Sequence, residues 1–156
     1  MDNILPRKII HLDLDAFFCA VEELHDPSLR GKAFAVGGKP EERGVVASCS
    51  YAARAYGVRS AMPMGRAVAL CPQILIVPAK HHLYSKASKK VMALLQNVTP
   101  LLEQISVDEA FLDVSDLPDD PEVIGKRLQT QIRDEAGLSS SVGIATNKLV
   151  AKIAND

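Results

Sequence analysis

The sequence lacks long hydrophobic runs and has few cysteines. Its apolar stretches are far shorter than the roughly 20 residues that a membrane span requires, and the opening segment MDNILPRKIIHLDLD has no uninterrupted apolar core like that of a signal peptide. We therefore expect a cytoplasmic protein with no membrane partner. The three cysteines, Cys19, Cys49 and Cys71, are far apart and form no C-x-x-C pair, so they predict buried free thiols rather than a disulfide framework or a zinc cluster.

Acidic residues are absent from one part of the chain. Residues 61–100 contain five lysine or arginine residues and two histidines but no aspartate or glutamate, whereas from Leu101 onward acidic residues outnumber basic ones eleven to five. This division is typical of a surface that faces a polyanion beside one that binds cations. The basic run by itself is explained more simply as the solvated face of a helix.

The apolar pattern predicts an α+β protein. Strands are expected at KIIHLDL, AFAVGG, VVASCS, ILIVPA and SSVGIA, and a hairpin is expected where LLEQIS and AFLDVS flank the polar step VDE. Helices are expected at AFFCAVEEL, YAARAYG, PMGRAVALC, HLYSKASKKVMALLQNV, PEVIGKRLQTQIRDEAG and NKLVAKIAND. Strand, helix, hairpin, helix and strand around one sheet correspond to a ferredoxin-like (split βαβ) fold, with residues from about Phe17 to Ala79 inserted as a small second α/β lobe.

Two carboxylates interrupt the first strand. Side chains two residues apart share a face of a strand, so His11, Asp13 and Asp15 point the same way. Asp13 is interior to the strand and needs a cation, because an unpaired buried carboxylate is costly. Asp108 and Glu109 at the hairpin supply a second acidic centre, and neighbouring central strands would bring the two centres together. Clustered oxygen ligands suit Mg²⁺ or Mn²⁺.

Each acid also has a simpler explanation. Asp108 and Glu109 could form a solvated turn, and an aspartate just before a helix is a common N-cap. For Asp15, which directly precedes the first predicted helix, the cap is the preferred interpretation and any metal role is secondary. Asp13 lies too far from that helix to cap it.

Four segments carry a resemblance to a known family. HLDLDAFFCAVEE, ASCSYAARAYGVRSAMP, SVDEAFLDVS and SVGIATNKLVAKIAND occur in order across essentially the whole chain, and together they resemble the signature segments of the Y-family, or translesion, DNA polymerases. The resemblance implies a catalytic palm at residues 1–16 and 80–156 and fingers at 17–79. It also implies thumb and little-finger domains that this chain does not contain, so we expect the chain to be a fragment.

The family's metal ligands match four positions of this sequence. The carboxylates are Asp13, Asp108 and Glu109, and the backbone carbonyl of Leu14 is a further ligand. The implied reaction is template-directed addition of deoxynucleotides to a primer 3′-hydroxyl with two Mg²⁺ ions, for which Mn²⁺ can substitute. Low fidelity and bypass of damaged templates are implied as well.

The resemblance also assigns residues that contact the nucleotide. Phe18 matches the steric gate that excludes a 2′-hydroxyl, although helical spacing alone favours a core aromatic. Tyr51 and Arg54, three residues apart, match the triphosphate contacts, although spacing alone favours an exposed arginine and a half-buried tyrosine. Ser106 and Lys152 lie in matched segments, with Lys152 expected to face the site from the last helix.

The implied partners are primer-template DNA, deoxynucleoside triphosphates and a sliding clamp, the last through the missing C-terminal part. A monomer is expected. Two other functions remain open from the residues. One is a nucleotidyl cyclase, which can use a similar sheet and two metals, and the other is a non-catalytic DNA-docking module in which the acids are structural.

Overall fold

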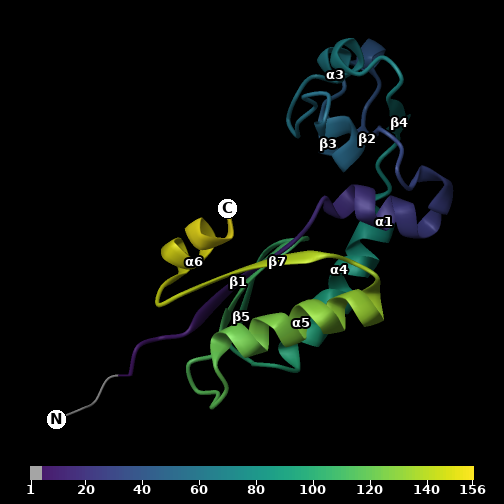
Figure 1. Cartoon of the computed structure of the whole chain (residues 1–156). Helices are drawn as coiled ribbons and strands as arrows, with labels where there is room; N and C mark the ends of the chain where they lie inside the picture. The colour runs from purple at the N-terminus through teal and green to yellow at the C-terminus, as the bar shows by residue number, and fades with distance from the viewer. Residues whose placement is uncertain (1–4) are drawn as a thin grey trace. The chain divides into compact units, whose positions relative to one another are not determined.

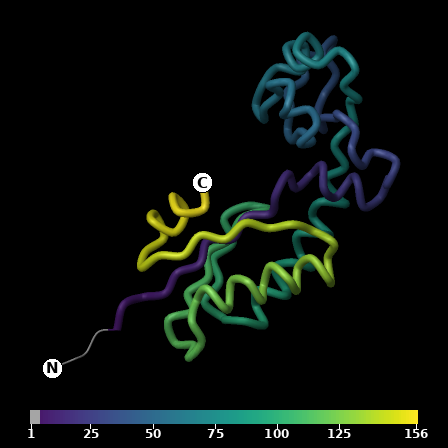
Figure 2. The backbone as a smooth tube through the Cα atoms, viewed as in Figure 1, coloured from purple at the N-terminus to yellow at the C-terminus, as the bar shows by residue number. Residues whose placement is uncertain are grey.

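The computed structural model describes residues 5–156 and divides the chain into two compact units. One unit consists of the chain up to Asp15 together with Ser85–Asp156, and the other is Ala16–Tyr84. The backbone leaves the first unit after strand β1 (Ile9–Leu14) and returns to it within helix α4 (His81–Gln96) (Figure 2). The two points at which the chain passes between the units lie close to the predicted domain limits at residues 16–17 and 79–80. The assignment of the two units as palm and fingers stays a prediction.

The discontinuous unit is built on a four-stranded sheet. Its strand order is β5 (Leu102–Ser106), β6 (Glu109–Asp113), β1 and β7 (Ser140–Ala145), and every neighbouring pair is antiparallel. Helix α5 (Pro121–Ala136) joins β6 to β7, and α6 (Lys148–Asn155) follows β7 (Figure 1). This order is that of the split βαβ arrangement, so the predicted ferredoxin-like fold and the predicted hairpin are confirmed.

Two glycines show how α5 and α6 cover opposite faces of this sheet. A Cβ at Gly143 in β7 would lie 2.1 Å from the carbonyl oxygen of Ala151, so only glycine allows α6 to approach that closely. A Cβ at Gly125 in α5 would lie 3.1 Å from the Val142 side chain. Because Val142 and Gly143 are consecutive in one strand, their outward directions are opposite. The α6 face is the face that carries His11 and Asp13.

The Ala16–Tyr84 unit has a separate three-stranded sheet. Its order is β3 (Val46–Cys49), β2 (Phe34–Gly37) and β4 (Leu75–Val77), with β2 antiparallel to β3 and parallel to β4. The helices are α1 (Phe17–His25), α2 (Tyr51–Arg54) and α3 (Met64–Leu70), with short 3₁₀ helices at Pro27–Leu29 and Pro40–Glu42. All three cysteines are buried free thiols, as predicted, and burial raises the pKa of Cys19 to about 12.

The predicted N-cap at Asp15 is wrong. The capping position of α1 is occupied by Ala16 at φ 42°, and no side chain accepts a hydrogen bond there. The Asp15 carboxylate instead accepts hydrogen bonds from the hydroxyls of Ser139 and Ser141, at 2.8 and 2.6 Å. Partners more than 120 residues away in the sequence therefore outcompete the local cap.

Within residues 5–156, no helix combines the length and the apolar composition that a bilayer crossing would need.

Candidate active site

Backbone register brings the two predicted acidic centres together. Asp13 lies directly opposite Glu109 in the β1–β6 ladder, and directly opposite residues of an antiparallel pair project from the same face. The amide of Leu14 donates a hydrogen bond to the carbonyl of Asp108, at 2.8 Å. Asp13, Asp108 and Glu109 thus gather at one end of the two central strands.

The environment at this end of the sheet disfavours the charged form of Asp13. The pKa of Asp13 is raised from 3.8 to about 6, first by burial and then by the carboxylates of Asp108 and Glu109. Among the described residues, 5–156, no three His, Cys, Asp or Glu side chains stand in the close grouping of a preformed metal site. The acids are neighbours on the sheet without forming a closed ligand set.

Within residues 5–156, the polar contacts of the Glu109 carboxylate fall on one of its two oxygens. Oε1 lies 2.7 Å from Nε2 of His11 and 3.0 Å from Nζ of Lys152. Partial burial alone would raise the pKa of Glu109, but hydrogen bonds from Lys152 and His11 outweigh it and lower the pKa. Since both contacts recorded within residues 5–156 fall on Oε1, Oε2 is left for a ligand. Lys152 reaches Glu109 from α6.

His11 and Asn155 were missed as site residues by the sequence analysis. The side-chain amide of Asn155 lies 2.8 Å from Nδ1 of His11, and it also faces the carbonyls of His11 and Ser141 at 3.3 and 3.2 Å. Carbonyls only accept, so the amide NH₂ points toward them, and Nδ1 then accepts as well. The ring proton therefore lies on Nε2 and is donated to Glu109. The available signal was the shared strand face of His11 and Asp13.

Asp108 is held by a neighbouring hydroxyl. The Ser106 Oγ donates to Oδ1 of Asp108 at 2.7 Å, and the backbone contact with Leu14 fixes the same residue from the adjacent strand. Asp15 lies just beyond β1, where its two serine partners satisfy it. Besides Glu109 and Lys152, four predicted site residues make polar contacts in this unit: Leu14, Asp15, Ser106 and Asp108.

Phe18 belongs to the Ala16–Tyr84 unit, on α1. Its ring stacks on Tyr84 with centroids 4.2 Å apart and planes 13° apart, and His81 meets it edge-on at 6.0 Å. The preceding ring, Phe17, is buried with 3% of its surface exposed, whereas Phe18 is only partly buried. Phe17 is thus a core residue, whereas Phe18 is a partly exposed ring that stacks on Tyr84.

Tyr51 and Arg54 share one side of α2 in the same unit. The Arg54 guanidinium carbon lies 4.8 Å from the centroid of the Tyr51 ring, a cation–π distance. Ser50 caps this short helix by accepting from the amide of Ala53 at 3.2 Å. Tyr51 is 63% exposed, so the pair presents a cation and a phenol side by side.

Comparison with known proteins identifies relatives over nearly the whole chain. A family model described as the impB/mucB/samB family matches residues 12–156. Proteins named DNA polymerase IV from Ralstonia nicotianae and Pseudomonas aeruginosa are 48% and 50% identical over 153 residues, which is 96% of this chain but 43% and 44% of theirs. The chain therefore spans less than half the length of these curated relatives.

Solved structures agree with the sequence relatives. The crystal structure of DinB from Sulfolobus solfataricus superposes with a TM-score of 0.87 at 31% identity, covering 94% of this chain and 44% of that one. An insertion ternary complex of Dbh DNA polymerase superposes with a TM-score of 0.86 at 32% identity and the same coverage.

Proposed function

Because the chain belongs to the impB/mucB/samB family, and the Y-family resemblance seen in its sequence is thereby confirmed, we propose that it is the palm and fingers portion of a translesion-type DNA polymerase. The proposed reaction is template-directed addition of deoxynucleotides to a primer 3′-hydroxyl, with low fidelity and bypass of damaged templates. The observation that carries the proposal is the gathering of Asp13, Asp108 and Glu109 at one end of the two central strands.

The donor set at this end fits divalent cations. Carboxylate oxygens are hard ligands of the kind that Mg²⁺ and Mn²⁺ prefer. Burial first, and then the charges of Asp108 and Glu109, raise the pKa of Asp13, and a bound cation would favour its charged form. We assign Asp13, Asp108, Glu109 and the Leu14 carbonyl as ligands of two Mg²⁺ ions, with Mn²⁺ as a substitute. When bound, the metals would supply Lewis-acid activation of the hydroxyl and neutralisation of phosphate charge.

The surrounding side chains keep the ligands oriented. Ser106 donates a hydrogen bond to Oδ1 of Asp108 and so fixes the orientation of this carboxylate, with Oδ2 as the proposed metal-binding oxygen. His11 and Lys152 contact Oε1 of Glu109, so Oε2 is the oxygen that would hold a metal. Lys152 adds a positive charge beside substrate phosphates. Asp15, satisfied by Ser139 and Ser141, fixes the end of β1 and has no metal role in this proposal.

The Ala16–Tyr84 unit supplies the nucleotide contacts. Phe18 acts as the steric gate against a ribose 2′-hydroxyl, and its partly exposed ring, stacked on Tyr84, suits exclusion by volume. Tyr51 and Arg54 bind the triphosphate, since the exposed phenol and the partly buried guanidinium lie side by side on one helix. In this assignment residues 1–16 and 80–156 are the palm and 17–79 the fingers. The substrates are primer-template DNA and deoxynucleoside triphosphates; a sliding clamp partner and a monomeric state complete the proposal.

The central test is Mg²⁺-dependent primer extension by the full-length gene product that carries this chain. Asp108→Ala should abolish extension and weaken Mn²⁺ binding in titration calorimetry. Asp113→Asn is the control, because Asp113 lies at the far end of β6, the strand that begins directly after Asp108. Unchanged Mn²⁺ binding by Asp108→Ala would favour the non-catalytic DNA-docking module instead.

The choice between ribose and deoxyribose distinguishes a polymerase from a nucleotidyl cyclase. Phe18→Ala should admit ribonucleotides during extension, because the volume that excludes the 2′-hydroxyl is removed. A wild-type protein that cyclises ATP would overturn the polymerase assignment, since a cyclase must accept the ribose. Equal sugar preference in wild type and Phe18→Ala would remove the gate assignment alone.

A further inference from the structure

Helix α1 contains a buried carboxylate, Glu22. Glu22 is only 3% exposed, although charged residues are seldom buried unless paired. Its Oε1 accepts a hydrogen bond from the Tyr84 hydroxyl at 2.7 Å, and its Oε2 lies 3.0 Å from Nζ of Lys80. Both partners belong to the same compact unit, so the whole arrangement can be considered as one rigid cluster.

This cluster continues directly to the Phe18 ring. Glu22 lies four residues after Phe18 in α1 and therefore on the same side of the helix. Tyr84 bridges the two, because its ring stacks on Phe18 at 4.2 Å while its hydroxyl is held by Glu22. Burial and the Glu22 hydrogen bond raise the pKa of Tyr84, so its hydroxyl stays a neutral donor.

Tyr84 has little freedom to move. It is 1% exposed, and two further rings meet it edge-on, Phe17 at 6.4 Å and His81 at 5.9 Å. Lys80 also touches Oε1 of Glu22 at 3.2 Å, so the carboxylate itself cannot rotate without losing a contact to the ammonium. The orientation of the Tyr84 ring, on which Phe18 stacks, is thus set by the hydrogen bond from the Tyr84 hydroxyl to Glu22.

An apolar residue at position 22 would fill the same space without the desolvation cost of a carboxylate, so burial alone does not account for the glutamate. A directional hydrogen bond, unlike apolar packing, specifies one orientation of its partner. We infer that Glu22 is a positioning residue for Phe18: by holding the Tyr84 hydroxyl, it sets the Phe18 ring and thereby the strictness with which a 2′-hydroxyl is excluded. This inference rests on the proposed gate role of Phe18.

The test is the ratio of kcat/KM for deoxynucleotides to that for matching ribonucleotides, measured on the full-length gene product. Tyr84→Phe keeps the stacked ring and removes only the hydroxyl, and it should lower the ratio about three- to tenfold, the range of one hydrogen bond. Glu22→Met should lower it at least as much. Glu22→Gln keeps an acceptor for the Tyr84 hydroxyl and should restore most of the discrimination.

Controls separate positioning from general damage to the fold. Glu23→Gln changes the adjacent carboxylate on α1, which takes no part in the Tyr84 contact, and it should keep the wild-type ratio. Thermal unfolding of each variant checks that the lobe is folded; should Glu22→Met fail to fold, Tyr84→Phe and Glu22→Gln still decide the matter. A Tyr84→Phe ratio equal to that of wild type overturns the inference.

A double variant ties the effect to Phe18. In a Phe18→Ala background, Tyr84→Phe should cause no further loss of sugar discrimination, because the ring that it positions is gone. A further loss as large as in the wild-type background would show that Tyr84 acts independently of Phe18 and would overturn the inference. If Phe18→Ala itself leaves the ratio unchanged, the gate proposal fails first, so the two failures are distinguishable.

Discussion

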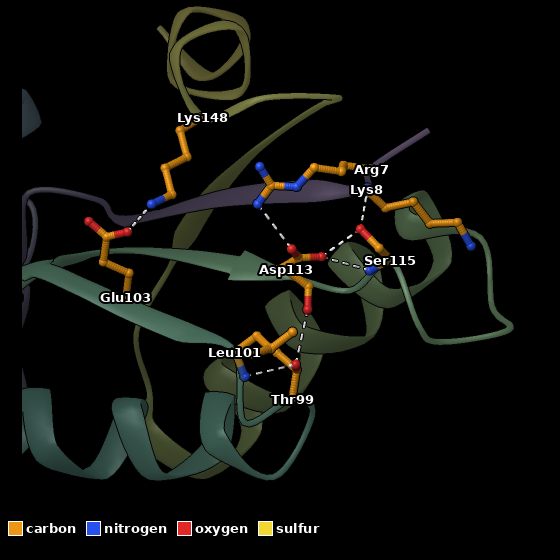
Figure 3. A network of polar contacts seen from close by, with 8 residues as sticks. All are labelled: Arg7, Lys8, Thr99, Leu101, Glu103, Asp113, Ser115 and Lys148. Carbon is orange, nitrogen blue, oxygen red and sulfur yellow. Dashed lines mark hydrogen bonds and ion pairs between the residues drawn. The ribbon is translucent and has the colours of Figure 1, made fainter. Parts of the chain in front are cut away.

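The two ends of the β1–β6 ladder each carry an aspartate, and the two aspartates have pKa values shifted in opposite directions. At one end Ile9 lies opposite Asp113, and at the other Asp13 lies opposite Glu109. Asp113 accepts hydrogen bonds from the hydroxyl of Ser115 at 2.5 Å and from the guanidinium of Arg7 at 3.1 Å (Figure 3). Its pKa is lowered, chiefly by the Ser115 hydrogen bond and with a smaller contribution from Arg7.

Asp13 has the reverse environment on the same strand pair. Burial and two neighbouring carboxylates raise its pKa to about 6. A carboxylate whose charged form is disfavoured lowers the stability of the fold, and this suits a site that binds a cation. A carboxylate that accepts hydrogen bonds from the protein itself instead stabilises the ends of the strands. Both ends contain an aspartate, so the environment of the carboxylate, and not the residue type, distinguishes the proposed metal site from the other end of the ladder.

The largest expected difference between the two ends is in catalysis. Asp13→Asn keeps the shape of the side chain but removes a proposed metal ligand, so primer extension should fall on the order of a thousandfold. Asp113→Asn should stay within about threefold of wild type, because it perturbs only a strand end. Steady-state extension assays on both variants check this. Comparable losses in the two variants would erase the functional contrast.

The pH dependence of stability should have opposite signs at the two ends. The folded-state pKa of Asp13, about 6, lies above its ordinary value of 3.8, so the folded state keeps this proton up to a higher pH than the unfolded state does. Stability contributed by this group therefore falls as pH rises from about 4 to about 6, by about 1–2 kcal/mol after allowance for its partial exposure. Urea unfolding of wild type and Asp13→Asn, without divalent cations, measures the difference.

Asp13→Asn should match wild type near pH 4 and be the more stable protein at pH 8, because the amide carries no charge to desolvate. Parallel stability profiles for the two proteins across this range would contradict the environment assigned to Asp13.

The smallest expected effect is at Asp113. Its folded-state pKa is depressed below 3.8, so its contribution to stability is present above that pH and is lost as the pH falls through the folded-state value. Asp113→Asn should cost about 0.5–1 kcal/mol at pH 7, a modest value because the Arg7 partner is exposed to solvent. Denaturant titrations at pH 7 and below pH 3 provide the check, and a cost that persists at low pH would count against it.

Local patterns were sufficient to predict much of the fold and part of the site. Alternation in KIIHLDL predicted β1 and placed Asp13 on a shared face with His11, and the polar step between two apolar runs predicted the β5–β6 hairpin. Asp15 shows where local reasoning failed. An aspartate before a helix is ordinarily a cap, but Ser139 and Ser141, brought alongside by β7, satisfied it instead.

Contacts between distant segments account for the residues that were missed. The pairs His11–Glu109 and Asn155–His11 join positions 98 and 144 residues apart, and Tyr84 reaches Glu22 across 62 residues. No periodicity or short motif encodes such pairs, because each depends on how strands and helices pack after they form.

The sequence by itself determined which segments become strands and helices, which oxygen-rich side chains occur on them, and which family the segments resemble, because these depend on local pattern and residue type. Only the tertiary structure decided which acids are satisfied and which are not. Asp13 and Asp113 are the same residue type on neighbouring strands, and their pKa values move in opposite directions because burial, nearby charge and hydrogen-bond partners are properties of the folded arrangement.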